Sequence, residues 1–190
     1  LMRRSIMRFV GIDPSLSRTG VAIIDNESVE LHSVKADAKY SIYRKQRSLV
    51  KQIRELLKRN DIVIFEDFGV SARFAPSGRF CERIELLGML KLVCPAATTL
   101  PWLSVAPTML KSFLTGKSSS HKSEVLAEVN SRWGVDASND DEADAYGLAK
   151  FGQAMVLDEE PHRKRKVKFE KYGMNKEHLA ILRFSYSSIL

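Results

Sequence analysis

The chain is poor in the features that mark secreted and membrane proteins. Its 190 residues include two cysteines, Cys81 and Cys94, which are too few for a disulfide framework and fit two buried thiols in a reducing compartment. No apolar stretch is long enough to span a bilayer, and no signal-peptide pattern opens the chain. Neither cysteine is spaced from a histidine as in a zinc site. We therefore expect a cytoplasmic protein without a membrane partner.

Acidic residues are outnumbered by basic ones. Counts of 30 Lys and Arg against 23 Asp and Glu give a formal charge of +7, and the sequence pI is about 9.5. Such a surface attracts anions, so nucleic acid is the leading candidate partner. With 44% hydrophobic residues, the chain is long enough to bury one self-sufficient core.

Hydrophobic periodicity predicts an α/β domain. Three short β-runs joined by turns indicate an antiparallel meander, a helix with a basic outer face follows, and a continuous apolar run is then typical of a buried parallel strand. In chain order, we expect strands at 8–13, 20–25 and 28–34, a helix at 40–59, a strand at 62–65, a helix at 79–93, a strand at 98–105, and helices from 107 to before 116, at 121–133 and at 140–152. The last helix begins with a capping-box pattern, Asn139 and Glu142. We predict a domain over 8–152 and a basic C-terminal extension over 153–190.

Four acidic residues stand where strand or helix ends could deliver them to one point. Asp13 closes the apolar run at 9–12, and Glu66 closes the run at 62–65. Asp141 and Asp144 are three residues apart, which puts both on nearly the same face of a helix. Acids on a basic chain suggest a metal-dependent nuclease, because divalent ions let carboxylates approach a phosphodiester that they would otherwise repel.

Each acid also has a purely structural explanation to weigh. Asp141 could complement the dipole of the helix that it begins, and Asp13 could cap a turn. Glu66 and Asp144 are harder to explain in this way. Asp67 is left out, because it points to the opposite face if the strand continues. The order and placement of the four acids together, rather than any one of them, indicate a site.

The motifs around these acids resemble those of the RuvC family of Holliday junction resolvases. They are Gly11-Ile12-Asp13-Pro14-Ser15 with Thr19-Gly20, then Phe65-Glu66, then Lys111 and Lys122, then DEADAYGLA at 141–149. The resemblance covers roughly 8–152 in family order and implies an RNase H-like fold. In that fold, three antiparallel strands of a mixed five-stranded sheet are followed by parallel additions, with helices on both faces.

The resemblance further implies a metal-dependent endodeoxyribonuclease, a crossover junction endonuclease. It would act as a homodimer that nicks symmetric strands of four-way DNA junctions by two-metal hydrolysis, leaving 5′-phosphate and 3′-hydroxyl ends. We expect two Mg²⁺ ions per site, for which Mn²⁺ substitutes. Our hypothesis is that Asp13 bridges both ions, Glu66 and Asp141 hold one, and Asp144 holds the other. A phage source would explain the tail and would place the protein in the host cytoplasm.

Basic and aromatic residues near the acids are the expected DNA contacts. Lys111 and Lys122 match family positions that contact the DNA backbone, and Lys117 lies between them. The loop at 71–79 interleaves cations with an aromatic ring in a way that suits unstacked bases. Its expected DNA-binding residues are Arg73, Phe74 and Arg79, and Phe74 is a better wedge candidate than Phe68.

Other readings of the sequence stay open. One is a broader branch or flap endonuclease on the same fold, and another is a junction-binding protein without catalysis. A sugar-kinase-like phosphotransferase would need two such domains. No nucleotide cofactor is expected, because Gly116-Lys117-Ser118 lacks the earlier glycine of a phosphate-binding loop and the strand leading into it. The wide apolar face of the 79–93 helix is the expected dimer interface.

Overall fold

The computed structural model of the chain describes residues 7–26, 28–67, 78–98, 102–157 and 180–181, and among these it describes residues 78–79 and 95–96 by their backbone alone. The elements are β1 (Arg8–Asp13), β2 (Thr19–Asp25), β3 (Ser28–Val34), α1 (Ile42–Leu56), β4 (Asp61–Glu66), α2 (Gly78–Ala97), β5 (Leu103–Val105), α3 (Pro107–Thr115), α4 (Lys122–Trp133) and α5 (Asp140–Leu157). None of the described helices is long and apolar enough to cross a membrane.

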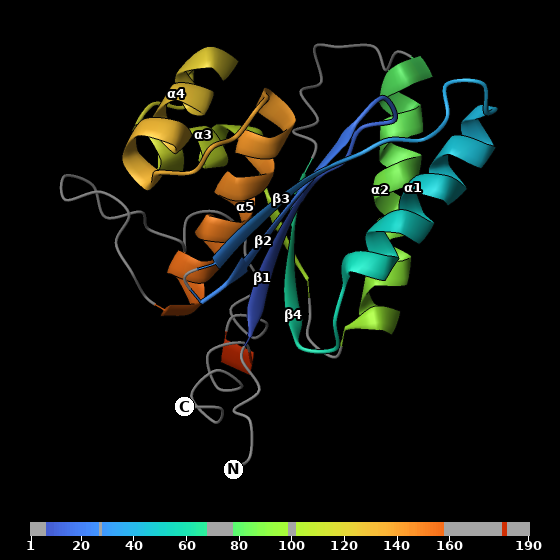
Figure 1. The fold of residues 1–190 in the computed structure, drawn as a ribbon, viewed down its shortest axis with the longest axis horizontal. Coiled ribbons are helices and arrows are strands. Elements are labelled where there is room, and N and C mark those ends of the chain that lie inside the picture. The colour runs from blue at the N-terminus through green and yellow to red at the C-terminus, as the bar shows by residue number, and fades with distance from the viewer. Residues whose placement is uncertain (1–6, 27, 68–77, 99–101, 158–179, 182–190) are drawn as a thin grey trace.

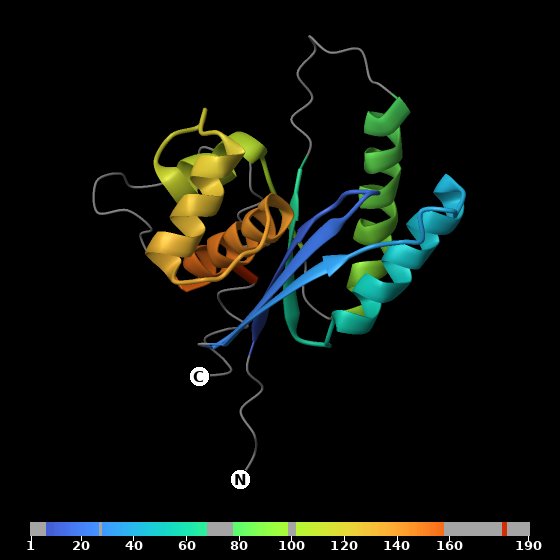
Figure 2. The ribbon, with the colours of Figure 1, turned by 45° about the horizontal axis from the view of Figure 1, so that its top comes forward.

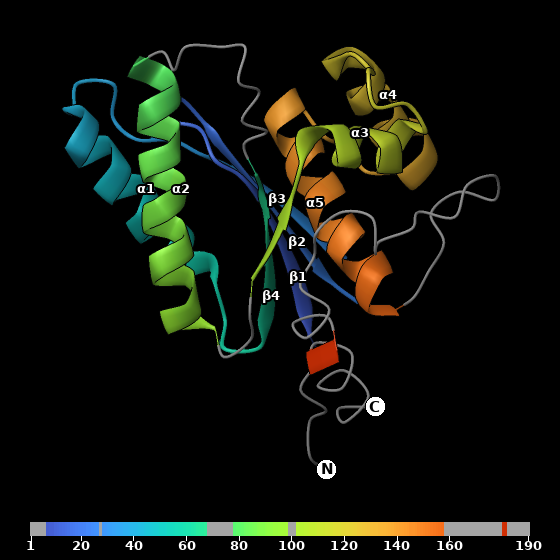
Figure 3. The ribbon, with the colours of Figure 1, turned by 180° about the vertical axis from the view of Figure 1, so that it is seen from behind.

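One mixed sheet, with strand order β3-β2-β1-β4-β5, organises the molecule. The first three strands pair antiparallel, whereas β4 pairs parallel with both β1 and β5. Helices α1 and α2 lie over one face, and α3, α4 and α5 lie over the other (Figure 1; seen from behind in Figure 3). The predicted RNase H-like architecture, with a mixed five-stranded sheet and helices on both faces, is confirmed.

Strand alternation divides the apolar side chains of the sheet into two cores. One core lies between the sheet and α3–α5 and includes Phe9, Ile62 and Ile64. The other lies between the sheet and α1–α2 and includes Val10, Ile12, Val63 and Phe65. Because successive residues of a strand point to opposite faces, Asp13 and Glu66, one residue beyond Ile12 and Phe65, point toward the α5 side.

Helix α5 crosses the sheet in direct contact with the backbones of β1 and β2 (Figure 2). Two glycines permit this approach. A Cβ atom added at Gly11 would lie 2.0 Å from the carbonyl oxygen of Ala145, and one at Gly20 would lie 2.0 Å from that of Asp141. Both neighbours are backbone atoms that a side-chain rotation cannot move away. The two glycines therefore determine how close the acids of α5 come to the end of β1.

A buried ion pair joins β1 and β4 at the end opposite to Asp13 and Glu66. The Arg8 guanidinium donates two hydrogen bonds of 2.8 Å to the Asp61 carboxylate and a third to the Leu56 carbonyl oxygen. Asp61 also accepts a hydrogen bond from the Lys58 amide. Bidentate Arg–carboxylate geometry is specific, so the pair holds these parallel strands in one register.

Several expectations from the sequence need correction. The strand expected at 98–105 is found as Leu103–Val105, and the helix expected at 40–59 is found as Ile42–Leu56. Helix α5 continues past Gly152 to Leu157, because Ala154 and Met155 still pack into the core; the division of the chain at 152 itself stays a prediction. Cys81 is exposed on α2, so only Cys94 is a buried thiol. Burial raises the pKa of the Cys94 thiol to about 12.

Replacing Gly20 by alanine should destabilise the domain by ~1–3 kcal/mol, because α5 or β2 must shift to admit the methyl group. Gly88→Ala is the matched control, since a Cβ there meets nothing within 4 Å and alanine is favoured over glycine in a helix by about 1 kcal/mol. Urea unfolding of both variants measures the difference. Equal effects of the two substitutions would contradict the proposed contact.

Candidate active site

Asp13 and Glu66 end two adjacent parallel strands. They follow the paired residues Ile12 and Phe65, so their carboxyl groups project from the same edge and the same face of the sheet. Asp13 is 5% exposed, and the Glu66 side chain is 15% exposed. Parallel pairing thus places two largely buried carboxyl groups together, as expected from the sequence.

Asp141 and Asp144 come to this edge on the first turns of α5. The Asp141 backbone packs against Gly20, and Asp144 lies one turn further along the helix. The charges of Asp13 and Asp144 both act on Glu66, and that of Asp141 acts on Asp13. The fold therefore brings all four predicted acids into one electrostatic cluster, the acid quartet.

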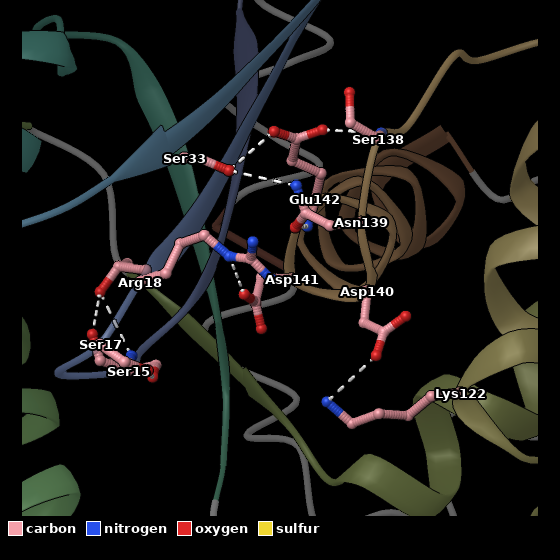
Figure 4. Close-up of polar contacts among 11 residues, drawn as sticks. Ser15, Ser17, Arg18, Ser33, Lys122, Ser138, Asn139, Asp140, Asp141 and Glu142 are labelled. Carbon is pink, nitrogen blue, oxygen red and sulfur yellow. Dashed lines mark hydrogen bonds and ion pairs between the residues drawn. The ribbon is translucent and has the colours of Figure 1, made fainter.

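The start of α5 is held in place by a fifth acid, Glu142. Ser33 of β3 donates a hydrogen bond of 2.7 Å to Glu142, and the Ser138 amide donates another of 2.9 Å. The Asn139 side chain accepts a hydrogen bond from the Glu142 amide, which is one half of the predicted capping box. In the other half, the Glu142 side chain accepts from the Ser138 amide rather than from the Asn139 amide. Burial acts to raise the pKa of Glu142, but these hydrogen bonds lower it (Figure 4). Glu142 thus fixes the helix start from which Asp141 projects.

Burial makes the charges of the quartet costly. Desolvation, followed by the charges of Asp13 and Asp144, raises the pKa of Glu66 to about 8. Desolvation and then Asp13 raise the pKa of Asp144 to about 7, and desolvation also raises that of Asp13. A group of buried carboxylates that repel one another is stabilised by a nearby positive charge.

Arginines from two other elements supply part of that charge. Arg83 of α2 places Nη2 at 3.6 Å from Asp13 Oδ1 and 3.8 Å from Glu66 Oε2. Arg18, in the turn between β1 and β2, donates through Nε to Asp141 Oδ2 at 2.5 Å (Figure 4). This turn is closed by Thr19, whose hydroxyl donates to the Ser15 carbonyl oxygen.

The oxygen-only donor set has the chemistry of a Mg²⁺ site. Asp13 Oδ1 is buried and accepts no hydrogen bond, which leaves it available as a ligand. Within the described residues, however, no three His, Cys, Asp or Glu side chains converge closely enough to hold one ion. Asp141 is directed to Arg18. The quartet therefore has the donors of a divalent-ion site but not, in this arrangement, its geometry.

The predicted DNA-binding residues fall into three groups. Lys111 and Lys122 lie near the quartet, since both charges act to lower the pKa of Asp144 against the larger effect of burial. Lys122 also pairs with Asp140 at 4.0 Å. Lys117, between α3 and α4, donates its amide to Thr115. The remaining three lie where the structure says nothing of their side chains: Arg73 and Phe74 are outside the described residues, and Arg79 is described by its backbone alone.

Arg18 and Arg83 were not predicted as site residues. Arg83 nevertheless carries a sequence signal, because it lies four and seven residues before Leu87 and Leu90, both buried, and so falls on the apolar stripe of its helix. Asp67 points to the opposite face of the sheet from Glu66, as the alternation of side chains along a strand predicts, because its carboxylate pairs at 3.9 Å with Lys91 of α2.

Comparison with known proteins gives a consistent set of relatives. No family model matches the chain. A crossover junction endodeoxyribonuclease RuvC from Synechococcus sp. (strain CC9311) is 26% identical over 161 residues, which is 77% of this chain and 98% of the relative. The Thermus thermophilus RuvC structure has a TM-score of 0.59 at 22% identity, covering 75% of this chain and 91% of that one. T. thermophilus RuvC in complex with Holliday junction substrate gives 0.60 at 21%, covering 75% and 90%.

These relatives bear on both the fold and the family. The two solved structures support the RNase H-like fold, and the curated relative extends over almost its whole length. The resemblance to the RuvC family that the motifs indicated is confirmed.

The raised pKa values predict a pH dependence of stability in the presence of a chelator. The pKa of Glu66 is 4.5 in the unfolded chain and about 8 in the folded protein. Its contribution to the free energy of unfolding is therefore fully present below pH 4.5 and is lost as pH rises toward 8. We expect the unfolding temperature to fall by roughly several degrees between pH 5.5 and 8.5, and Glu66→Gln to flatten this fall.

The matched control is Glu55→Gln, which removes an acid with a 65% exposed side chain on α1. Its pH dependence should follow that of the parent. Identical profiles for the Glu66→Gln variant and the parent would contradict the raised pKa.

Proposed function

We propose that this RuvC-like protein is a Holliday junction resolvase, a structure-specific endonuclease that depends on divalent metal ions. The observation that carries the proposal is the acid quartet, with carboxyl groups from the ends of β1 and β4 and from the first turns of α5. A nuclease needs acids on an otherwise basic surface, because the metal must be held while the DNA is attracted. The curated RuvC relative has this activity in its name.

The quartet would hold two Mg²⁺ ions, or Mn²⁺ in their place. When bound, such ions supply a hydroxide nucleophile and stabilise the leaving oxygen, so that cleavage leaves a 5′-phosphate and a 3′-hydroxyl. The residues of the chain have distinct parts in this. Asp13 and Glu66 come from rigid strand ends, which keeps their positions fixed. Arg18 donates to Oδ2 of Asp141, so an ion would bind Oδ1 of this carboxylate or compete with Arg18 for Oδ2.

Basic residues around the quartet would hold the DNA backbone. Lys111 and Lys122 lie on the Asp144 side, and the Lys122 side chain is 61% exposed, so it can reach a phosphate. On the other face of the sheet, α1 presents Arg44, Arg47, Lys51 and Arg54 beside a groove. Binding through several phosphates predicts an affinity that falls steeply with salt.

A homodimer would suit the symmetry of a four-way junction. A C2 dimer presents two equivalent sites to two symmetry-related strands. Helix α2 supports this arrangement, because Leu92 is 79% exposed and Ile84 is 42% exposed on a helix whose other face is buried. In the proposed dimer, the partner subunit would cover these two side chains.

Junction cleavage by purified protein is the direct test of the nuclease proposal. We expect Mg²⁺-dependent, symmetric nicking of a synthetic four-way junction and a loss of at least about a hundredfold in Asp144→Asn, since even residues behind metal ligands cost ten to a hundredfold. Asp136→Asn, at an exposed position after α4, should cleave at the parental rate. Binding without nicking would favour the non-catalytic alternative, and equal cleavage of flaps and forks would favour a broader branch endonuclease.

The dimer has its own prediction. Leu92→Glu should shift the protein from dimer to monomer in sedimentation velocity, because it places a charge in an apolar contact. Val29→Glu makes the same change at a 38% exposed position on β3 and should leave the dimer intact. A parent that sediments as a monomer at all concentrations would rule out this interface.

A further inference from the structure

Arg83 is a basic residue on the largely apolar helix α2. Its neighbours on the same helical stripe, Leu87 and Leu90, are buried against the sheet. The Arg83 side chain extends past the end of the sheet to the quartet, where it remains 38% exposed. It therefore reaches both the buried carboxylates and the solvent from which DNA would approach.

The Arg83 guanidinium donates a hydrogen bond to the backbone beside the quartet. Arg83 Nε donates a hydrogen bond of 3.1 Å to the carbonyl oxygen of Pro14, the residue directly after Asp13. The distances from Nη2 to Asp13 and Glu66 are 3.6 and 3.8 Å, longer than the 2.7–2.9 Å of a charge-assisted hydrogen bond. Arg83 thus faces both carboxyl groups and offsets their negative charge when they are ionised, at distances longer than those of close hydrogen bonds.

Arg83 is also the leading positive charge on both residues. Burial is the largest influence on the pKa of Asp13 and of Glu66 and raises both. Among the charges that act in the opposite direction, Arg83 comes first for each. Lys122 acts on Asp13 more weakly, and the lysines at 111 and 122 act mainly on the Asp144 side. The quartet therefore has separate sources of positive charge on its two sides.

We infer that Arg83 is a positioning residue that serves as the resident cation of Asp13 and Glu66 and moves from them to a DNA phosphate when a divalent ion binds. A divalent ion held by these carboxylates would repel the guanidinium, and a phosphate would offer it a new anionic partner. DNA would then strengthen ion binding, and ions would strengthen DNA binding by the same factor. This inference rests on the proposed metal-dependent function and adds a regulatory step to it.

The inference makes a directional prediction for ion binding without DNA. Replacing Arg83 by glutamine removes the competing charge, so Mn²⁺ should bind at least about fivefold more tightly, which is the effect expected for unit charges about 4 Å apart in bulk water and therefore a lower bound for a site at a protein surface. Arg83→Lys keeps the charge and should bind Mn²⁺ close to the parental affinity. Calorimetric titration of the full chain with Mn²⁺ measures all three proteins.

Two further variants make the titration decisive. Lys39→Gln removes an equal charge from an exposed position before α1 and should leave Mn²⁺ affinity unchanged. Arg83→Met keeps the length of the apolar stem, so it replaces the glutamine variant if thermal unfolding shows that the latter is poorly folded. Tighter binding in a folded neutral variant supports the inference.

Junction cleavage supplies an independent readout. With Arg83→Gln, the Mn²⁺ concentration for half-maximal cleavage should fall, whereas the maximal rate should also fall because a phosphate has lost its partner. Arg83→Lys should restore both in part. Unchanged or weaker Mn²⁺ binding in the neutral variants would overturn the role of Arg83 while leaving the nuclease proposal intact. A parent that neither binds Mn²⁺ nor cleaves would overturn both.

Discussion

The direct contact between α5 and the backbones of β1 and β2 is the constraint on which the rest of the site depends. It exists because Gly11 and Gly20 present no side chain where the Ala145 and Asp141 carbonyl oxygens approach. A helix packed on ordinary side chains would stand further from the sheet. The acids of α5 would then lie further from Asp13, and the cluster would be more open.

Charge is distributed around this contact in a way that explains the basic composition. The quartet buries negative charge that the apolar surroundings disfavour, and each part of it has a positive neighbour from another element: Arg83 from α2, Arg18 from the β1–β2 turn, and Lys122 from α4. The same cations are partly exposed, so they face any polyanion that approaches the site. Stability of the free protein and attraction of DNA thus draw on one set of side chains.

The positions of the four acids could be predicted from the sequence, whereas those of the two arginines could not. Asp13 and Glu66 end apolar runs, and strand alternation with parallel pairing then determines where their side chains point. Asp141 and Asp144 follow from helical spacing. Arg83 and Arg18 were missed because long, flexible side chains reach the site from elements distant in sequence, and only the packing of α2 and the closed turn at Thr19 aim them. The orientation of Asp141 toward Arg18 depends on the same tertiary contacts.

The buried pair of Arg8 and Asp61 gives β1 and β4 two unlike ends. At one end the charges are fully matched, with a bidentate contact of 2.8 Å that needs nothing from outside. At the other end, Asp13 and Glu66 face a guanidinium at 3.6 and 3.8 Å, and the buried Asp13 Oδ1 accepts no hydrogen bond. A slip of one residue would turn every side chain of a strand to the other face. The Arg8–Asp61 pair therefore keeps Asp13 and Glu66 aligned with each other. The positions of the candidate ligands at one end of these strands thus depend on an ion pair at the opposite end, which would contact no ligand itself.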